Sequence, residues 1–271
     1  MIHIHGSPFS GSKHDPEVEE LCAHLYGTGQ AGGLVSFMGK VQTDLVIKHG
    51  IITVFDNGAF SLWKRLKKLG TLEGFDWDKH WTKFYLWLFM YYSKIEWFLI
   101  PDVIEGSEEE NDRLINSVPS MFKDKAVPVW HTVESIERFI RLCEEFDIVA
   151  IGACGPHQTI MSDACISRLG HAFDEIYHYR NINVKIHGLR MTDNRVVAKF
   201  PFHSCDSTSV VTREKMSRED TPGIKGRLAR TAVFKAAMEK TKSPTVDEWK
   251  IKRKEKSMAL QLVSIDQMEL I

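Results

Sequence analysis

Acidic and imidazole side chains follow several short apolar runs in this sequence. Asp56, Asp102 and Asp206 each come within three residues of the end of such a run, and His131 and His187 follow two others. Carboxylates and imidazoles can act as nucleophiles, as general acids and bases, or as metal ligands. If the runs are parallel strands, their carboxyl ends lie at one rim, and these five side chains gather there.

The apolar runs number eight, and segments with helical spacing and helix-capping residues separate them. Nearly continuous apolar strands that alternate with helices predict a parallel sheet covered by helices. The sequence therefore predicts an α/β fold, a (β/α)8 TIM barrel, with a doubly wound open sheet as the alternative. The predicted strands are Ile2–His5, Gly33–Met38, Gly50–Phe55, Trp97–Ile100, Val127–Trp130, Ile148–Ile151, Asn183–Ile186 and Phe200–His203.

The charge of the chain is unevenly distributed. The 271 residues carry 35 Lys and Arg against 36 Asp and Glu, and 43% are apolar, which is typical of a globular protein. Residues 212–256 have a net charge of +7, however, whereas the remainder has −8. We therefore predict a barrel domain over 1–211 and a basic helical extension over 212–271 packed on it. The basic excess indicates an anionic partner such as nucleic acid, or simply a solvated helical face.

Cysteine use and hydropathy bear on the compartment. The five cysteines are an odd number without a Cys-x-x-Cys pair, which is typical of a reducing environment. The first residues lack the features of a signal peptide. The longest apolar run, Phe84–Tyr92, is too short to cross a bilayer. The sequence predicts a cytoplasmic protein without a membrane segment.

Two segments resemble motifs of the tRNA-guanine transglycosylase superfamily. Residues 56–60, Asp-Asn-Gly-Ala-Phe, are similar to its Asp-Ser-Gly-Gly-Phe motif, and residues 202–208, Phe-His-Ser-Cys-Asp-Ser-Thr, resemble the segment with its nucleophilic Asp. Val-Trp-His at 129–131, Ala-Ile-Gly at 150–152 and Lys-Ile-His-Gly at 185–188 follow the family's order. The resemblance covers residues 33–211 and is greatest to short virus-encoded members linked to 7-deazaguanine in DNA.

The resemblance implies a (β/α)8 barrel and specific roles for single residues. Asp206 would be the nucleophile, Asp56 the acid/base partner, and Asp102 the group that recognises the base edge. His131 stands roughly where the family has a Gln that contacts the base. The other implied base-binding residues are Phe60, Gly152, His187 and Gly188.

The implied reaction is the exchange of guanine in nucleic acid for a free 7-deazaguanine. Breaking an N-glycosidic bond produces an oxocarbenium-like centre, which a carboxylate can stabilise and bond to covalently. A base inside a duplex cannot reach such a pocket, so the substrate must be single-stranded or have its nucleotide flipped out. The basic segment then supplies candidate phosphate ligands, which are Arg213, Lys225, Arg227 and Arg230.

The tRNA-acting relatives carry a zinc site that this sequence lacks. Their Cys-x-Cys-x2-Cys cluster is missing, and Cys154, His157 and Cys165 are the nearest approach to it. We therefore predict no metal and no cofactor, and we favour DNA over tRNA as the partner. A tRNA-guanine transglycosylase remains an alternative.

Two further functions are compatible with the sequence. His3 and His5, together with His131, His187 and Asp206, resemble the metal ligands of amidohydrolase barrels, in which a metal activates water. A barrel that only binds nucleic acid would use the basic extension without chemistry. The aromatic-rich stretch around Trp81 and Trp87 could cover the barrel or form a homodimer.

Overall fold

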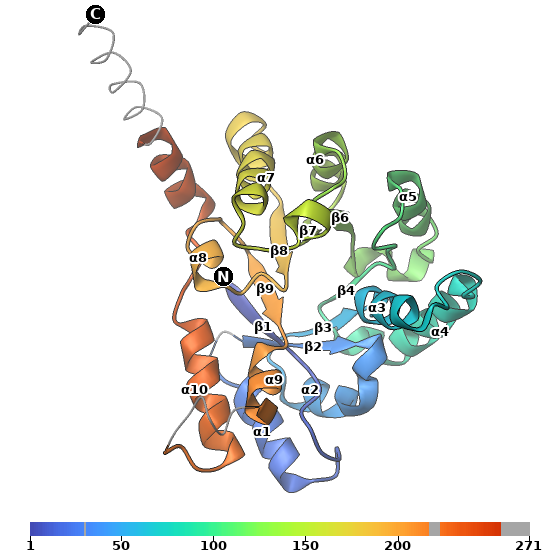
Figure 1. Cartoon of the computed structure of the whole chain (residues 1–271), viewed down its shortest axis with the longest axis vertical. Coiled ribbons are helices and arrows are strands. Elements are labelled where there is room, and N and C mark those ends of the chain that lie inside the picture. Colours follow the sequence, from blue (N-terminus) through green and yellow to red (C-terminus); the bar gives the residue numbers. More distant parts are fainter. Residues whose placement is uncertain (30, 217–222, 256–271) are drawn as a thin grey trace, which may run out of the picture.

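The computed structural model describes residues 1–29, 31–216 and 223–255, and its strands form one parallel sheet that curls into a nearly closed barrel (Figure 1). The sheet order is β5-β4-β3-β2-β1-β9-β8-β7-β6. The strands are β1 (Ile2–Gly6), β2 (Ala31–Ser36), β3 (Thr53–Asp56), β4 (Trp97–Leu99), β5 (Ala126–Val127), β6 (Val129–His131), β7 (Ile148–Gly152), β8 (Lys185–Leu189) and β9 (Ser204–Ser207).

The barrel has eight strand positions because β5 and β6 are one extended segment interrupted by Pro128. Proline has no backbone N–H to donate to a strand ladder. Its carbonyl still accepts a hydrogen bond from the N–H of Ala150 in β7 at 2.9 Å, while the carbonyl of Val127 accepts one from Ile100 on the β4 side at 2.9 Å. The segment therefore joins the two ends of the sheet, which confirms the predicted barrel of eight strands.

The eighth strand was predicted at Phe200–His203, which is wrong: the strand lies four residues later, at Ser204–Ser207 (β9). Phe200 and Phe202 instead pack around Phe173 in the outer layer, with ring centres 5.3 and 5.2 Å from it. Asp206 consequently lies within a strand and not in the loop after it. Its place on β9, opposite Ile4 of β1, fixes the backbone that carries it.

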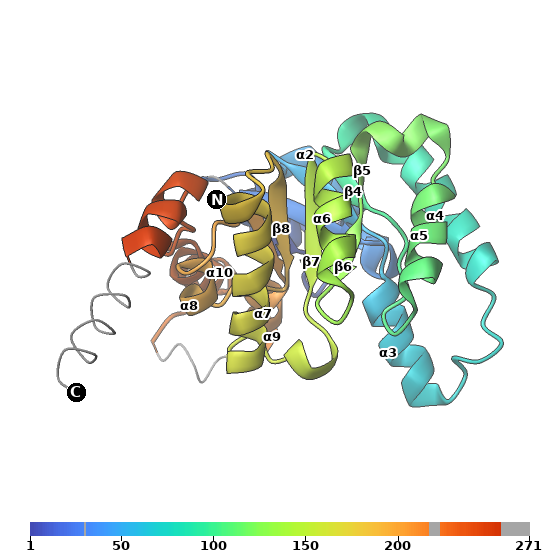
Figure 2. The same cartoon turned by 90° about the horizontal axis from the view of Figure 1, so that it is seen from above.

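Viewed down the shortest axis of the molecule, helices surround the sheet (Figure 1). Figure 2 shows α6 and α7 along the outside of β7 and β8. None of the described helices is long and apolar enough to cross a membrane. The helices are α1 (Pro16–Tyr26), α2 (Thr43–His49), α3 (Ala59–Leu69), α4 (Trp77–Tyr91), α5 (Glu108–Asn116), α6 (Ile136–Glu145), α7 (Asp163–Phe173), α8 (Asn194–Val197), α9 (Ser209–Met216), α10 (Arg227–Glu239) and a last one at 246–255.

Alternate residues of each strand face the barrel interior and the helices. Ile4, Leu34, Val54 and Leu99 belong to the cluster inside the barrel, whereas their neighbours along the strands pack under the helices. The interior is apolar in its lower part. Polar side chains such as Asp206 also face the interior towards the carboxyl ends of the strands, where chemistry is placed in this fold.

The segment after residue 211 packs on the barrel with buried side chains. Helix α10 contacts α1 and α9 and buries Thr231 and Phe234. Trp249, in the helix at 246–255, joins the outer core beside Phe173. The predicted capping box at Thr245 is present. Residues 217–222 and 256–271 of the predicted extension lie outside the described residues, and the domain boundary at 211/212 stays a prediction.

Candidate functional site

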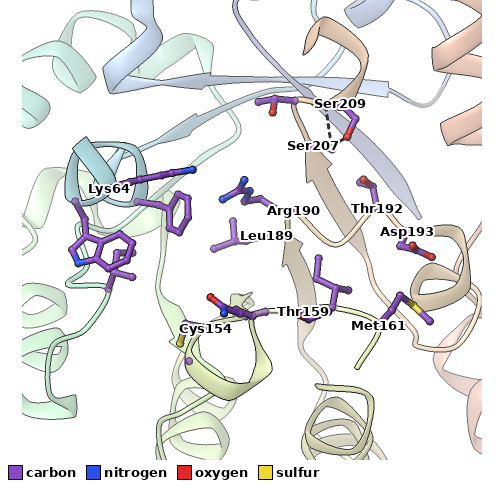
Figure 3. A pocket seen from close by; sticks show the side chains of 18 of the residues that line it. Lys64, Cys154, Thr159, Met161, Leu189, Arg190, Thr192, Asp193, Ser207 and Ser209 are labelled. Atoms are coloured by element: carbon purple, nitrogen blue, oxygen red, sulfur yellow. Dashed lines mark hydrogen bonds between the residues drawn. The ribbon is translucent and has the colours of Figure 1, made fainter. Parts of the chain in front are cut away.

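A large cavity opens at the carboxyl ends of the barrel strands. Its volume is about 1740 Å³, and the loops after β3, β4, β6, β7, β8 and β9 line it. Figure 3 shows the side chains of Lys64 and Arg190 pointing into the same space, with Leu189 beside Arg190. The sequence places its three candidate aspartates on three of these same strand ends, so the cavity is the natural location for a site.

Asp206 is held in a buried polar setting next to this cavity. Its side chain is 8% exposed. One carboxylate oxygen accepts a hydrogen bond from the backbone N–H of Arg190 at 2.9 Å, and Nε2 of His187 lies 3.4 Å from the same oxygen. The other ring nitrogen of His187 lies 2.9 Å from the Ser204 hydroxyl, which orients the imidazole. These contacts hold the carboxylate through one of its two oxygens.

Asp56 lies at the end of β3 beside Ser36 of β2, and it is the most perturbed carboxylate of the site. Removal from water raises the pKa of Asp56 to about 6, and the charges of Asp206 and Asp102 act in the same direction. The Ser36 hydroxyl and the Gly58 amide oppose the shift. A pKa near 6 allows the carboxyl group both to donate and to accept a proton near neutral pH. Asn57, the next residue, donates a hydrogen bond to Asp102 at 2.8 Å and so ties the Asp56 segment to Asp102.

The carboxylate of Asp102 is buried and is paired with the imidazole of His131. Its two oxygens accept hydrogen bonds from Asn57 Nδ2 and pair with His131 Nε2, both at 2.8 Å. Burial alone lowers the pKa of His131, but the hydrogen bonds to Asp102 and Glu134 outweigh it and raise the pKa to about 10. His131 is therefore an imidazolium between the carboxylates of Asp102 and Glu134, and its contact with Asp102 orients that carboxylate.

The far side of this pair is a buried network that the sequence analysis missed. Glu134 accepts hydrogen bonds from the backbone N–H of His131 at 2.8 Å, from Asn111 at 2.9 Å and from Arg138 at 2.6 Å. Arg138 also pairs with Asp112 at 2.9 Å. The four-residue spacing of Glu134 and Arg138 was the available signal, but such pairs are common on exposed helices and did not indicate a buried network.

Cationic and aromatic side chains line the cavity, whereas Asp56, Asp102 and Asp206 are not among its lining residues. The guanidinium carbon of Arg190 lies 4.5 Å from the ring centre of Phe60, an arrangement that is attractive electrostatically. Lys64, Lys67 and Lys68 come from the same helix as Phe60 and also line the cavity. Of these residues only Phe60 was predicted from the sequence. The Lys-Arg-Leu-Lys-Lys stretch at 64–68 was a visible signal for the others.

The two predicted glycines of the site stand where side chains would collide. A Cβ at Gly152 would come within 3.2 Å of the His131 ring. A Cβ at Gly188 would meet the Met191 Cβ at 2.9 Å and Cys205 Sγ at 3.0 Å. Gly152 thus gives His131 its room, and Gly188 lets β8 approach β9 closely next to Asp206.

The four predicted phosphate ligands do not come together. Arg213 lines the large cavity, whereas Lys225, Arg227 and Arg230 line a smaller hollow with Glu17. Arg227 pairs with Glu214 at 2.7 Å and with Glu17 at 3.2 Å, and Arg230 pairs with Glu214 at 3.5 Å. The positive charges of these two arginines are therefore largely balanced inside the protein.

The predicted metal-ligand set of an amidohydrolase is not assembled. His3 and His5 share the outward face of β1, since Ile4 between them points into the barrel. Nε2 of His3 lies 3.1 Å from the Thr241 carbonyl, and Nε2 of His5 lies 2.8 Å from Glu239 of α10. His131, His187 and Asp206 are inside. Within residues 1–29, 31–216 and 223–255 no group of three His, Cys, Asp or Glu residues could hold a metal ion.

Fold and site together define a (β/α)8 barrel with an acidic centre at the carboxyl ends of its strands. No protein-family model matches the chain, and a comparison with curated proteins also gives no match.

Among solved structures, the chain is similar to tryptophan synthase subunit alpha from Campylobacter jejuni, at 16% identity and a TM-score of 0.44, over 81% of this chain and 90% of that one. It is similar to a flavocytochrome b2 variant with sulfite bound, at 14% identity and a TM-score of 0.49; the match covers 93% of this chain but only 64% of the flavocytochrome. A structure from Aquifex aeolicus VF5 matches at 11% identity and a TM-score of 0.46, over 92% of this chain and 91% of that one. At these identities the likeness extends no further than the barrel fold.

Proposed function

We propose that this protein exchanges guanine in nucleic acid for a free 7-deazaguanine base through a covalent intermediate on Asp206. The observation that carries the proposal is the position of Asp56, Asp102 and Asp206 at the carboxyl ends of β3, β4 and β9, where burial and the two neighbouring charges raise the pKa of Asp56 to about 6. Carboxyl groups in different environments are what a nucleophile and an acid/base partner require. The motif resemblance around Asp56 and Asp206 agrees with this assignment.

In the first half of the reaction, a carboxylate oxygen of Asp206 attacks C1′ of the target nucleotide as the glycosidic bond to guanine breaks. The departing base gains a proton from Asp56, which is protonated in a useful fraction of molecules because its pKa is about 6. The products of this half are free guanine and a nucleotide bonded to Asp206. Atoms and charge balance without an added reactant, and the chemistry requires no cofactor.

In the second half, the incoming 7-deazaguanine attacks C1′ and releases Asp206. The now ionised Asp56 accepts the proton that the base loses on bonding, so the site returns to its starting state. Asp102 would accept hydrogen bonds from the N–H groups on the base edge that guanine and 7-deazaguanine share. Its pairing with the His131 imidazolium favours an acceptor in this role.

The polymer in this proposal is DNA in preference to tRNA, because the zinc segment of the tRNA-acting relatives is missing from the sequence. The proposed partners are therefore single-stranded or flipped-out DNA and a free 7-deazaguanine. A cytoplasmic location, a viral origin and a homodimer stay predictions.

The test is release of guanine from an oligonucleotide labelled in that base, with 7-deazaguanine present. DNA and RNA of the same sequence form the two arms, and we expect release from DNA. Asp206→Asn should abolish release while leaving oligonucleotide binding intact. Asp78→Asn, which changes an exposed carboxylate on α4, is the matched control and should behave like the unchanged protein. Binding without release from either polymer would support a nucleic-acid-binding barrel and refute the exchange.

A further inference from the structure

Helix α3 carries positive charge directly into the cavity. It begins immediately after the Asp56 segment, and its sequence from Ala59 to Leu69 contains four basic and no acidic residues. Phe60, Lys64, Lys67 and Lys68 all line the cavity, a spacing that corresponds to one face of the helix. Lys67 pairs with Glu105 at 2.8 Å. No carboxylate among the described residues pairs with Lys64 or Lys68.

Arg190 brings a further cation to the same space from the loop after β8. Its backbone has a φ of 59°, in the left-handed region that a side chain rarely adopts. In this conformation its N–H reaches Asp206, and its guanidinium lies over Phe60. No carboxylate within the described ranges neutralises that guanidinium. Strained backbone of this kind is retained where the surroundings impose it, which is common at functional sites.

Helices α3 and α10 differ in whether carboxylates neutralise their basic side chains. On α10 and beside it, Arg227 and Arg230 balance Glu214, and Lys235 pairs with Glu239. A polyanion would have to compete with these buried carboxylates. The cations of α3 and Arg190 have no such competition, apart from Lys67, and they line the cavity at the carboxyl ends of the strands that carry the aspartates. Their net positive charge also offsets the repulsion between three carboxylates and an approaching phosphate.

The geometry points to Lys64, Lys68 and Arg190 as the residues that bind the phosphodiester backbone on either side of the nucleotide whose base enters the barrel. The exposed ring of Phe60, 39% accessible, stacks Arg190 and offers a face for a neighbouring base. This inference rests on the proposed function, because it takes nucleic acid as the substrate. It assigns the phosphate contacts to α3 and the β8–α8 loop instead of to Lys225, Arg227 and Arg230.

The experiment measures binding of a fluorescent single-stranded oligonucleotide by anisotropy over a range of salt concentrations. The double variant Lys64→Gln/Lys68→Gln should weaken binding about tenfold or more and lower the slope of log Kd against log salt by about 1.4, since each lost phosphate contact on a single strand contributes about 0.7. Lys79→Gln/Lys83→Gln is the matched control, because it removes two exposed lysines with the same spacing from α4. It should leave both quantities unchanged.

Arg190 requires two variants because its backbone also holds Asp206. Arg190→Lys keeps the charge and should retain the salt slope, whereas Arg190→Gly suits the left-handed φ and should lower the slope by about 0.7. Lys225→Gln tests the competing surface beside α10 and should bind like the unchanged protein. The same measurements with DNA and with RNA oligonucleotides show which of the two polymers this surface binds.

The outcomes separate this inference from the proposed function. If base exchange occurs but the α3 variants bind like the α4 control, the inference is wrong and the exchange stands. If the α3 variants lose affinity while no polymer undergoes exchange, the binding surface stands and the exchange is wrong. A protein that binds neither DNA nor RNA would overturn the inference directly.

Discussion

Asp56 should reduce the stability of the folded protein at neutral pH, and replacing it should therefore stabilise the fold while abolishing activity. Burial and the neighbouring charges of Asp206 and Asp102 raise the pKa of Asp56 from 3.8 to about 6. The fold thus favours the neutral carboxyl. The stability that this provides is complete below the unfolded pKa and is lost as the pH rises through about 6.

The size of the effect follows from the shift. A change of about two units corresponds to about 3 kcal/mol at 1.36 kcal/mol per unit. Asp56 keeps partial contact with solvent, so we expect about 1–3 kcal/mol. Asp56→Asn, which resembles the neutral form in shape, should raise the free energy of unfolding by this amount at pH 7.5. At pH 5, within the transition between the two pKa values, the gain should be roughly half as large.

Urea unfolding at pH 5 and pH 7.5 measures both values. Asp102→Asn is the contrasting variant, because it removes the negative charge that lies 2.8 Å from the buried His131 imidazolium. It should lower the free energy of unfolding by about 1–3 kcal/mol. An Asp56→Asn protein that is no more stable than the parent at pH 7.5, or whose gain is the same at both pH values, would refute the reasoning.

Three further predictions follow from the same contacts. His131→Gln removes the positive charge that balances Asp102, so the pKa of Asp56 should rise further and the alkaline limb of the pH–rate profile for guanine release should move to higher pH; an unmoved limb would contradict this. Arg138→Met leaves Glu134 and Asp112 without their buried cation and should cost about 3–5 kcal/mol in urea unfolding, and a loss below about 1 kcal/mol would show that the network is not a buried ion pair. Gly188→Ala should lower the free energy of unfolding by about 1–3 kcal/mol, since its Cβ would lie 2.9 Å from the Met191 Cβ. Gly170→Ala in α7 places its Cβ in open space and should raise the free energy of unfolding by about 0.5–1 kcal/mol. Equal melting temperatures for the two variants would count against the packing argument.

The sequence was sufficient to predict the barrel, because apolar periodicity and strand length are local properties. Its one displaced strand shows the limit of that signal. Phe200 and Phe202 have the apolar alternation of a strand, but they fill the outer core against Phe173, and the more polar Ser204–Ser207 forms the strand. A polar strand is possible here because its inward side chains belong to the site.

The candidate site was predictable only in part, for reasons of direction and pairing. His3 and His5 were placed on the correct strand, but the register that turns both outward depends on which residues the barrel interior accepts. Arg227 was predicted to bind phosphate, yet its partners Glu17 and Glu214 are distant in sequence or on another helix. Arg190 acquires its position from a left-handed backbone that no local sequence pattern predicts.

The central claim is that Asp206 forms a covalent bond to the nucleotide, and the most direct measurement is the mass of the denatured adduct. Protein incubated with a single-stranded DNA oligonucleotide and 7-deazaguanine would be denatured, digested and analysed by mass spectrometry. The account predicts a nucleotide attached to the peptide that contains Asp206, and no adduct in Asp206→Asn. An adduct on another residue, or one that survives in Asp206→Asn, would contradict it.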